Sequence, residues 1–478
     1  MPFPFVLPTA SSLSFADFFA SSTHPSLPLA ATTGRAIVRD ALKRHKRLPP
    51  PSRPADLPAV LDALNSYLPY LLALDAGLGG SPVGGEEVDV ALLKELEVEW
   101  RPTLTASVPG REPPRQRLRS IDSEIAFVLS TLGFTYSLLA RARLRTLYDA
   151  TIPTDAQRAA AISAAMKHFL DANSAHAHAL ARSSQWTSAP PAADILTSTQ
   201  SALASLTLAE ATLIAVLKDD PYPAVVAEDR NEASKDWMFK SPSIPKVRAH
   251  LFAHLCLAAA EHAAKGLAVL RGTAGGRLDD ALPKYLDDLR RTARGKACRF
   301  LGIDAELAGK TGEGIAWLRA AKKELGFATA GSDDDRKKMS GFSKFKKEWA
   351  ERREDRKIEK GGAWGSDAGR FEEGRVLDML EKKWVKMNDT VNVQVVPPSE
   401  PLVASMPSGR EYHTPKPFKA PNLDEDALAR MRAPPDPCDA AAQGGEADSS
   451  DDENAAGSDP VGAFPGTKAQ YSGESSYY

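Results

Sequence analysis

One helical segment carries residues that could share a metal ion. His250, His254 and Glu261 fall on a helix predicted over residues 247–265. At about 100° of rotation per residue, the three side chains lie within about 40° of one another. Two imidazoles four residues apart and a carboxylate are ligands that zinc accepts. The pattern therefore supports, as one alternative, a metal-dependent enzyme with its site at these three residues.

The same strip of the helix has a simpler interpretation. It is flanked by two apolar stripes, one containing Leu251 and Leu255 and the other Phe252 and Cys256, so the histidines and the glutamate occupy the only polar face left. Nothing nearby supplies the further ligand and the supporting hydrogen bonds that a metal site needs. We favour a solvated polar face, and we expect no metal, no cofactor and no catalytic residue.

No other motif for chemistry is present in the sequence. It contains no G-x-x-x-x-G-K-[ST] phosphate loop, no G-x-G-x-x-G turn after a strand and no G-x-S-x-G nucleophile elbow. The cysteines Cys256, Cys298 and Cys438 form no C-x-x-C pair and are too few for a disulfide framework. These features favour a cytosolic protein that is not an enzyme.

Composition limits the partners further. The 60 Lys and Arg residues nearly balance the 62 Asp and Glu residues of the 478-residue chain, so we expect no nucleic-acid partner. The first residues lack the basic start and the long apolar stretch of a signal peptide. The most apolar window, residues 67–74, is interrupted by Pro69 and followed by Asp75. We therefore expect no membrane-spanning segment and only indirect membrane association.

Helical periodicity dominates the first two thirds of the chain. One exception is residues 97–103, where period-two alternation predicts a short strand. Residues 345–360 mix opposite charges at helical spacing and predict a solvated helix. Apolar helices are predicted over residues 33–47, 58–76, 121–148, 154–183, 197–218, 244–270, 278–301, 311–325 and 371–387.

The end of the chain has a different composition. After residue 420 prolines, glycines and an acidic run replace the periodic apolar residues, and such a segment cannot bury enough apolar surface to offset its ordering entropy. We therefore predict a folded domain over residues 1–419 and a disordered acidic and proline-rich tail over residues 420–478.

A short peptide after the helix at 197–218 has two interpretations. Tyr222-Pro223-Ala224-Val225 resembles the Tyr-Pro-x-Leu peptides that sorting adaptors recognise. Pro221 and Pro223 would also end the preceding helix by their own backbone restrictions. We favour the second interpretation, a turn.

Several segments, taken in chain order, resemble the BRO domain of Alix-like adaptors, and residues 2–8, 235–251 and 461–468 are most similar to its fungal members in ambient pH signalling. The resemblance implies an all-α, boomerang-shaped domain: a tetratricopeptide-like helical solenoid with a small β-sheet and no catalytic role. The segments that carry it are Val98-Glu99-Trp100, residues 123–133, Leu208-Ala209-Glu210-Ala211, residues 311–318, residues 388–392 and Pro407-Ser408-Gly409-Arg410.

The resemblance also implies a function. Members of the family bind the C-terminal helix of the polymer-forming ESCRT-III subunit in an apolar groove. Its fungal members link a receptor complex at the cortical membrane to proteolytic activation of a zinc-finger transcription factor. By resemblance we expect a cytoplasmic adaptor of the alkaline pH response, recruited to the plasma-membrane cortex or the endosomal surface, with ESCRT-III and components of the receptor complex as partners.

Alignment with the family places the groove on two helices. The anchors are the Leu208-Ala209-Glu210-Ala211 run and Ala249-His250-Leu251. The alternative is that the aligned residues are ordinary solenoid core, because apolar residues cover two stripes of the second helix and only one stripe can face a partner. The residues placed at or beside the groove are Leu213, Val216, Val247 and Leu251.

Overall fold

The computed structural model describes residues 2–107, 112–148, 154–186, 189–223, 246–273, 278–327 and 364–435. These residues belong to one compact unit, Met1–Pro435, and Asp436–Tyr478 forms a second unit that lies outside the described residues. The charged helix predicted over residues 345–360 also lies outside them.

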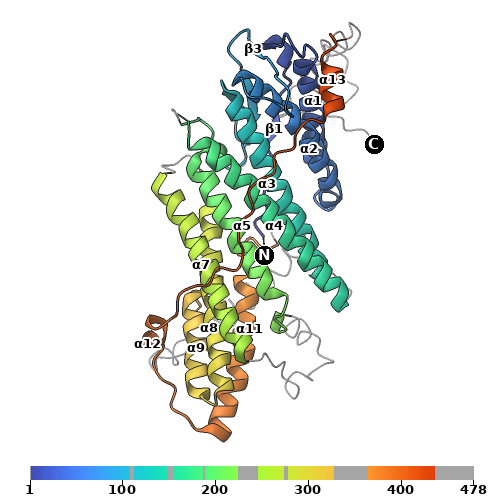
Figure 1. Ribbon diagram of the computed structural model, residues 1–478. Coiled ribbons are helices and arrows are strands. Elements are labelled where there is room, and N and C mark those ends of the chain that lie inside the picture. The colour runs from blue at the N-terminus through green and yellow to red at the C-terminus, as the bar shows by residue number, and fades with distance from the viewer. Residues whose placement is uncertain are drawn as a thin grey trace, which may run out of the picture. The chain divides into compact units, whose positions relative to one another are not determined.

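Long helices that pack on their neighbours in chain order build the first unit (Figure 1). The helices α1 and α2 pair with each other, and from α3 onward each helix packs against the next as far as α9, with α11 against α8 and α9. This nearest-neighbour packing defines a helical solenoid. The main helices are α1 Leu27–Arg47, α2 Arg53–Leu78, α3 Ile121–Arg145, α4 Asp155–Ser183, α5 Thr197–Leu217, α7 Lys246–Thr273, α8 Ala281–Leu307, α9 Thr311–Glu324 and α11 Arg370–Met387.

Shorter elements join these helices. Single helical turns η1, η2 and η3 lie at Phe15–Asp17, Thr146–Tyr148 and Ala193–Ile195, and a π-helical turn, η5, follows α11 at Asn388–Asn392. Two short helices, α12 Ser399–Ala404 and α13 Glu425–Met431, come last. The helices predicted from periodicity are confirmed, and the largest shifts are at the start of α1 and at the end of α8.

The prediction that no segment is long and apolar enough to cross a membrane was wrong. Three helices meet that criterion by length and composition: Arg53–Leu78, Ile121–Tyr148 and Thr197–Leu217. The first continues through Pro69 because its apolar face is packed, with Tyr67 and Leu71 fully buried. Between 50% and 78% of the most apolar window of each helix is buried inside the fold. Many of the apolar residues in these helices therefore belong to the protein core.

The predicted strand belongs to a small antiparallel sheet. Its order is β1 Thr9–Ala10, β4 Val98–Arg101 and β5 Gln116–Leu118, and a separate pair joins β2 Phe19–Ala20 to β3 Ala91–Leu92. Within β4, Val98 and Trp100 are fully buried while the two residues that alternate with them are half-buried. The period-two pattern of the sequence therefore reports a real inner and outer face.

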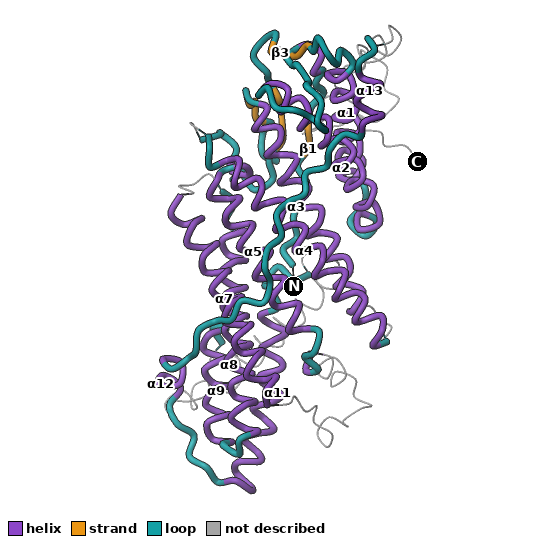
Figure 2. Tube along the Cα trace, viewed as in Figure 1, coloured by secondary structure: helices purple, strands orange, loops and turns teal. Residues whose placement is uncertain are grey.

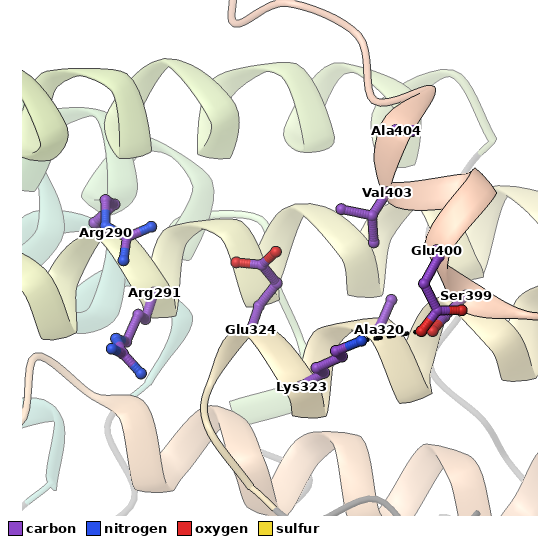
Figure 3. Close-up of a pocket in the computed structure, with 9 residues that line it drawn as sticks. All are labelled: Arg290, Arg291, Ala320, Lys323, Glu324, Ser399, Glu400, Val403 and Ala404. Carbon is purple, nitrogen blue, oxygen red and sulfur yellow. Dashed lines mark hydrogen bonds and ion pairs between the residues drawn. The ribbon is translucent and has the colours of Figure 1, made fainter.

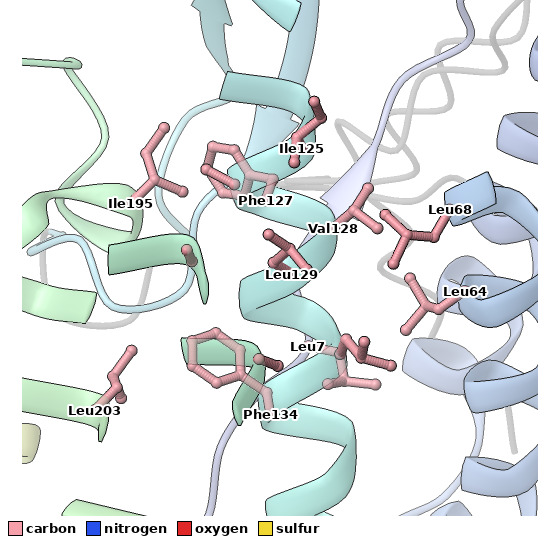
Figure 4. Close-up of a cluster of buried hydrophobic side chains, with 14 of the residues drawn as sticks. Leu7, Leu64, Leu68, Ile125, Phe127, Val128, Leu129, Phe134, Ile195 and Leu203 are labelled. Atoms are coloured by element: carbon pink, nitrogen blue, oxygen red, sulfur yellow. The ribbon is translucent and has the colours of Figure 1, made fainter. Parts of the chain in front are cut away.

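The main hydrophobic core surrounds α3. Figure 4 shows Val128 on the side of Leu64 and Leu68 from α2, whereas Phe134 lies on the side of Leu203 from α5. All five side chains are fully buried. Helix α3 is therefore buried on opposite sides and is the central element of this part of the solenoid.

The first residues of the chain are inserted into this core. The ring of Phe3 packs edge-on against Tyr285 at 5.1 Å, and the ring of Phe5 stacks on Phe134 at 4.5 Å. The backbone N–H of Phe3 donates to Glu210 Oε1 at 3.1 Å, and the Tyr285 hydroxyl donates to the same oxygen at 2.7 Å. The buried carboxyl of Glu210 therefore ties the N-terminal segment to α8.

This carboxyl makes stability depend on pH. Burial raises the pKa of Glu210 to about 7, although the hydrogen bonds from Tyr285 and Phe3 lower it. The folded state therefore holds a proton that the unfolded chain releases near pH 4.3, so the stability present at low pH is lost as the pH rises through about 7. Between pH 4.5 and pH 8 the free energy of unfolding of the unaltered chain should fall by about 3 kcal/mol more than that of Glu210→Gln. Urea denaturation at each pH measures both. Parallel pH profiles for the two proteins would contradict the assignment.

The predicted start of the tail at residue 420 needs correction. Helix α13 is capped by Asp424, whose side chain accepts from the backbone N–H of Ala427 at 2.6 Å. Leu423, Leu428 and Met431 are buried in the main core. The folded unit thus extends to Pro435, because a single apolar turn is too short to stand out in a composition average yet finds a complementary surface in the folded chain.

Truncation tests this packing. Removing residues 423–478 takes away the buried side chains of Leu423, Leu428 and Met431 and exposes the core that they cover. Burial of each contributes about 1.5–3 kcal/mol to the free energy of unfolding. We expect a melting temperature lower by at least about 5 °C, measured by calorimetry. Removing only residues 436–478 should leave the melting temperature within a degree or two of the full chain. Equal melting temperatures for both truncations would show that α13 contributes nothing.

Candidate partner-binding surface

The four residues predicted to line a groove do not share one environment. Leu213 of α5 is half-buried and packs against both main apolar clusters, and Leu251 of α7 is half-buried against the second cluster. Val216 is only 1% exposed and belongs to that second cluster. Val247 belongs to α7, but its side chain lies outside the described residues. Leu213 and Leu251 therefore retain exposed surface, whereas Val216 is part of the solenoid core.

A shallow pocket lies beside Leu213. Its volume is about 50 Å³. Its lining combines apolar side chains, among them Leu213 and Leu217 of α5, with the charged Asp220, Lys296 and Glu372. Leu213 and Leu217 are four residues apart and therefore share one face of the helix. Leu217 was not among the predicted residues, although this spacing is the signal that identifies it.

A buried ionic network holds the chain that follows α5. Arg299 of α8 is fully buried, and its Nη2 lies 2.5 Å from Asp220 Oδ2 while its Nε lies 2.5 Å from Glu373 Oε1 of α11. Burial alone would raise the pKa of Asp220, but the charge and hydrogen bonds of Arg299 outweigh it and hold that pKa below its ordinary value. The network fixes the wall of the pocket formed by the end of α5.

The Tyr-Pro peptide lies at the same place. Tyr222 is only 5% exposed, and its backbone N–H donates to Asp220 Oδ1 at 3.1 Å. A buried tyrosine cannot present itself to a sorting adaptor in this conformation. Ala224 and Val225 lie outside the described residues.

A larger cavity, of about 470 Å³, lies between α8, α9 and α12 (Figure 3). Its charges are neutralised within the protein, because Arg290 and Arg291 both pair with Asp287, and Lys323 Nζ lies 3.0 Å from Glu400 Oε1. A cavity lined by paired charges does not offer the continuous apolar surface that an amphipathic helix requires.

An extended arm, residues 405–424, runs from α12 along the helices to α13 (Figure 2). It binds the histidine strip of α7. His254 Nδ1 donates to the carbonyl oxygen of Ser408 at 2.7 Å, and the N–H of Arg410 donates to the carbonyl oxygen of His254 at 3.1 Å. Glu261 Oε1 accepts from the N–H of Gly409 at 3.0 Å. His250 and Glu261 are exposed and His254 is half-buried, so the strip is a polar face at the surface, as predicted. The sequence did not predict that the arm also hydrogen-bonds to it.

The geometry gives the metal alternative no support. His250 Nε2 and His254 Nε2 lie 3.1 Å apart, and His254 must carry its proton on Nδ1 to donate to Ser408, so its Nε2 accepts from His250. Glu261 is engaged by the arm. In the part of the chain that the structure describes, no three His, Cys, Asp or Glu side chains are placed to hold a metal ion.

Gly409 sets how closely the arm approaches α7. A Cβ at this position would lie 2.5 Å from the backbone nitrogen of Ala258 and 2.6 Å from its Cα, and helix backbone cannot move aside cheaply. We expect Gly409→Ala to lift the arm, lower the melting temperature and speed amide hydrogen exchange at Arg410. Gly272→Ala, in helix α7, is the control, because no atom lies within 4 Å of a Cβ placed at that position. Unchanged exchange at Arg410 in Gly409→Ala would contradict the close approach.

A nearest-neighbour helical solenoid with a small antiparallel sheet and a C-terminal extended arm is the BRO class of fold. A crystal structure of ALIX in complex with the SIVmac239 PYKEVTEDL late domain has the same fold, with a TM-score of 0.50 and 15% sequence identity, covering 91% of this chain and 51% of that one. The fold class expected from the sequence is thereby confirmed.

The relatives are more specific. The chain is 47% identical to the pH-response regulator protein palC of Emericella nidulans, over 98% of this chain and 99% of that protein. It is 28% identical to the protein of the same name from Cryptococcus neoformans var. neoformans, over 88% and 92% of the two chains. No family model matches the chain. The chain belongs to the palC family of pH-response regulators, and the family resemblance is confirmed.

Proposed function

We propose that the chain is a non-enzymatic adaptor of the alkaline pH response that binds the C-terminal helix of the polymer-forming ESCRT-III subunit. Membership of the palC family supports the pathway, and the BRO motifs of the sequence support the partner. The observation that carries the binding site is the half-buried face of Leu213 and Leu217, which lies beside a small pocket lined by both apolar and charged side chains.

This face fits the chemistry of an amphipathic helix. Such a helix presents apolar residues at positions three and four apart, and it needs a shallow apolar strip with a polar rim. Leu213 and Leu217 supply the strip, with Leu251 and Val247 as the proposed α7 side. The rim includes Arg248, whose Nη1 lies 3.2 Å from Asp219 Oδ2 on the surface.

The adaptor acts by bringing partners together rather than by chemistry. We infer that it works in the cytoplasm at the plasma-membrane cortex or the endosomal surface, where it joins ESCRT-III to components of the pH-signalling receptor complex. That assembly supports proteolytic activation of a zinc-finger transcription factor. The role needs no metal or cofactor.

Binding of a fluorescent C-terminal ESCRT-III peptide, followed by anisotropy, tests the site. We expect Leu213→Gln/Leu217→Gln to weaken binding at least about tenfold, because groove anchors each contribute more than about 1 kcal/mol. Its melting temperature should fall by no more than a few degrees, since both side chains are already half-exposed. Val216→Gln places an amide in the core and should lower stability by several kcal/mol, on the order of 2–4.

A matched control is Ile37→Gln, which removes an apolar side chain that is 54% exposed on α1 and should leave the affinity unchanged. Unaltered peptide binding by the double variant would overturn the site. Failure of the unaltered chain to bind any ESCRT-III C-terminal peptide would overturn the proposed function itself.

A further inference from the structure

The loop after α11 carries an unusual set of apolar side chains. Val391, Val393 and Val395 are 74%, 79% and 89% exposed, more than any other large apolar residue in the described chain. Leu307, at the end of α8, is another exposed apolar residue, with 43% of its surface accessible. Exposed apolar residues are normally scattered singly, whereas here three occur within five residues.

The loop is fastened to the turn between α8 and α9. The side chain of Gln394 donates from Nε2 to the carbonyl oxygen of Gly309 at 2.8 Å and accepts at Oε1 from the N–H of Gly312 at 3.0 Å. Asn392 Nδ2 donates to Thr311 Oγ1 at 2.7 Å. These bonds fasten the loop to the turn that follows Leu307. We call the exposed residues of the loop and of this turn the η5 surface.

Val393 is held in a strained backbone conformation. Its φ of 48° and ψ of 41° lie in the left-handed region, which a β-branched residue rarely adopts and which asparagine or glycine tolerates well. Its side chain is 79% exposed and so gains little from packing. A strained residue with an exposed apolar side chain is typical of a functional contact.

The exposed charges of the η5 surface are mostly positive. Lys310 on the α8–α9 turn and Lys382 and Lys386 in the last turns of α11 are exposed. Asp389 is exposed among them, and Glu313 is half-buried, with its Oε2 3.3 Å from Lys310 Nζ. This balance favours a partner with negative charge.

We propose that the η5 surface binds an anionic lipid membrane, with the valines inserted among the headgroups and the lysines beside the lipid phosphates. The interface of a bilayer can bury exposed apolar side chains without a pocket shaped to fit them. Lysines close to an anionic leaflet add a salt-sensitive attraction. The chain would then touch the membrane directly, in contrast to the indirect association expected from its sequence.

Flotation of the full chain with phosphatidylserine-containing vesicles tests this proposal. We expect Val391→Ser/Val393→Asn/Val395→Ser to reduce binding more than about tenfold, because each buried valine contributes to partitioning. Lys382→Gln/Lys386→Gln should reduce binding about 25-fold, at about fivefold per charge, and salt should weaken the unaltered chain in the same direction. Val393→Asn alone should weaken binding while leaving the melting temperature equal or higher, since asparagine relieves the strain.

The matched control is Leu93→Gln. Leu93 is 61% exposed, but Glu87, Glu95 and Glu97 lie close to it in the sequence, so this change should not alter flotation. Leu213→Gln/Leu217→Gln should also float normally, which separates this proposal from the ESCRT-III site. No flotation of the unaltered chain, or equal flotation by the triple valine variant, would overturn the membrane site. Equal binding to vesicles of neutral phosphatidylcholine would overturn the role of the lysines.

Discussion

The buried carboxylate of Glu124 joins the elements on which the rest of the structure depends. From α3, where it is fully buried, it accepts hydrogen bonds from Arg35 Nε of α1 at 2.8 Å, Tyr67 Oη of α2 at 3.1 Å and Trp100 Nε1 of β4 at 2.6 Å. Arg35 in turn donates to the carbonyl oxygen of Ser11, beside β1, at 2.5 Å. Because a buried charge is tolerated only when it is paired and hydrogen-bonded, the sheet and the first two helices close around α3 together.

The same constraint recurs further along the solenoid. Asp194, fully buried in η3, accepts from the backbone N–H groups of Thr103 and Leu104 and so fixes the loop after β4. Arg299 ties the end of α5 to α8 and α11. In a solenoid each helix touches only its neighbours, so these buried polar contacts add specificity at particular interfaces.

The sequence by itself determined the local elements and much of their grouping. The 3.6-residue and two-residue periods gave the helices and β4, because these patterns depend only on which face is buried. The family motifs contained Trp100, Glu124 and Glu210, and all three prove to be buried polar contacts of the fold. The helix that carries His254 was also predicted, but not what binds its polar face.

Only the tertiary structure decided the outcomes that depend on distant segments. Val216 and Leu217 are adjacent, both apolar and both part of the same pocket lining, yet Val216 is 1% exposed whereas Leu217 is half-buried. The arm hydrogen-bonds to His254 although Ser408 lies 154 residues further along the chain. Helix α13 packs against the main core, which the sequence of its seven residues does not predict. Periodicity shows that a helix or strand has an apolar face. Which other segment packs against that face depends on contacts between distant parts of the chain, which no local pattern encodes.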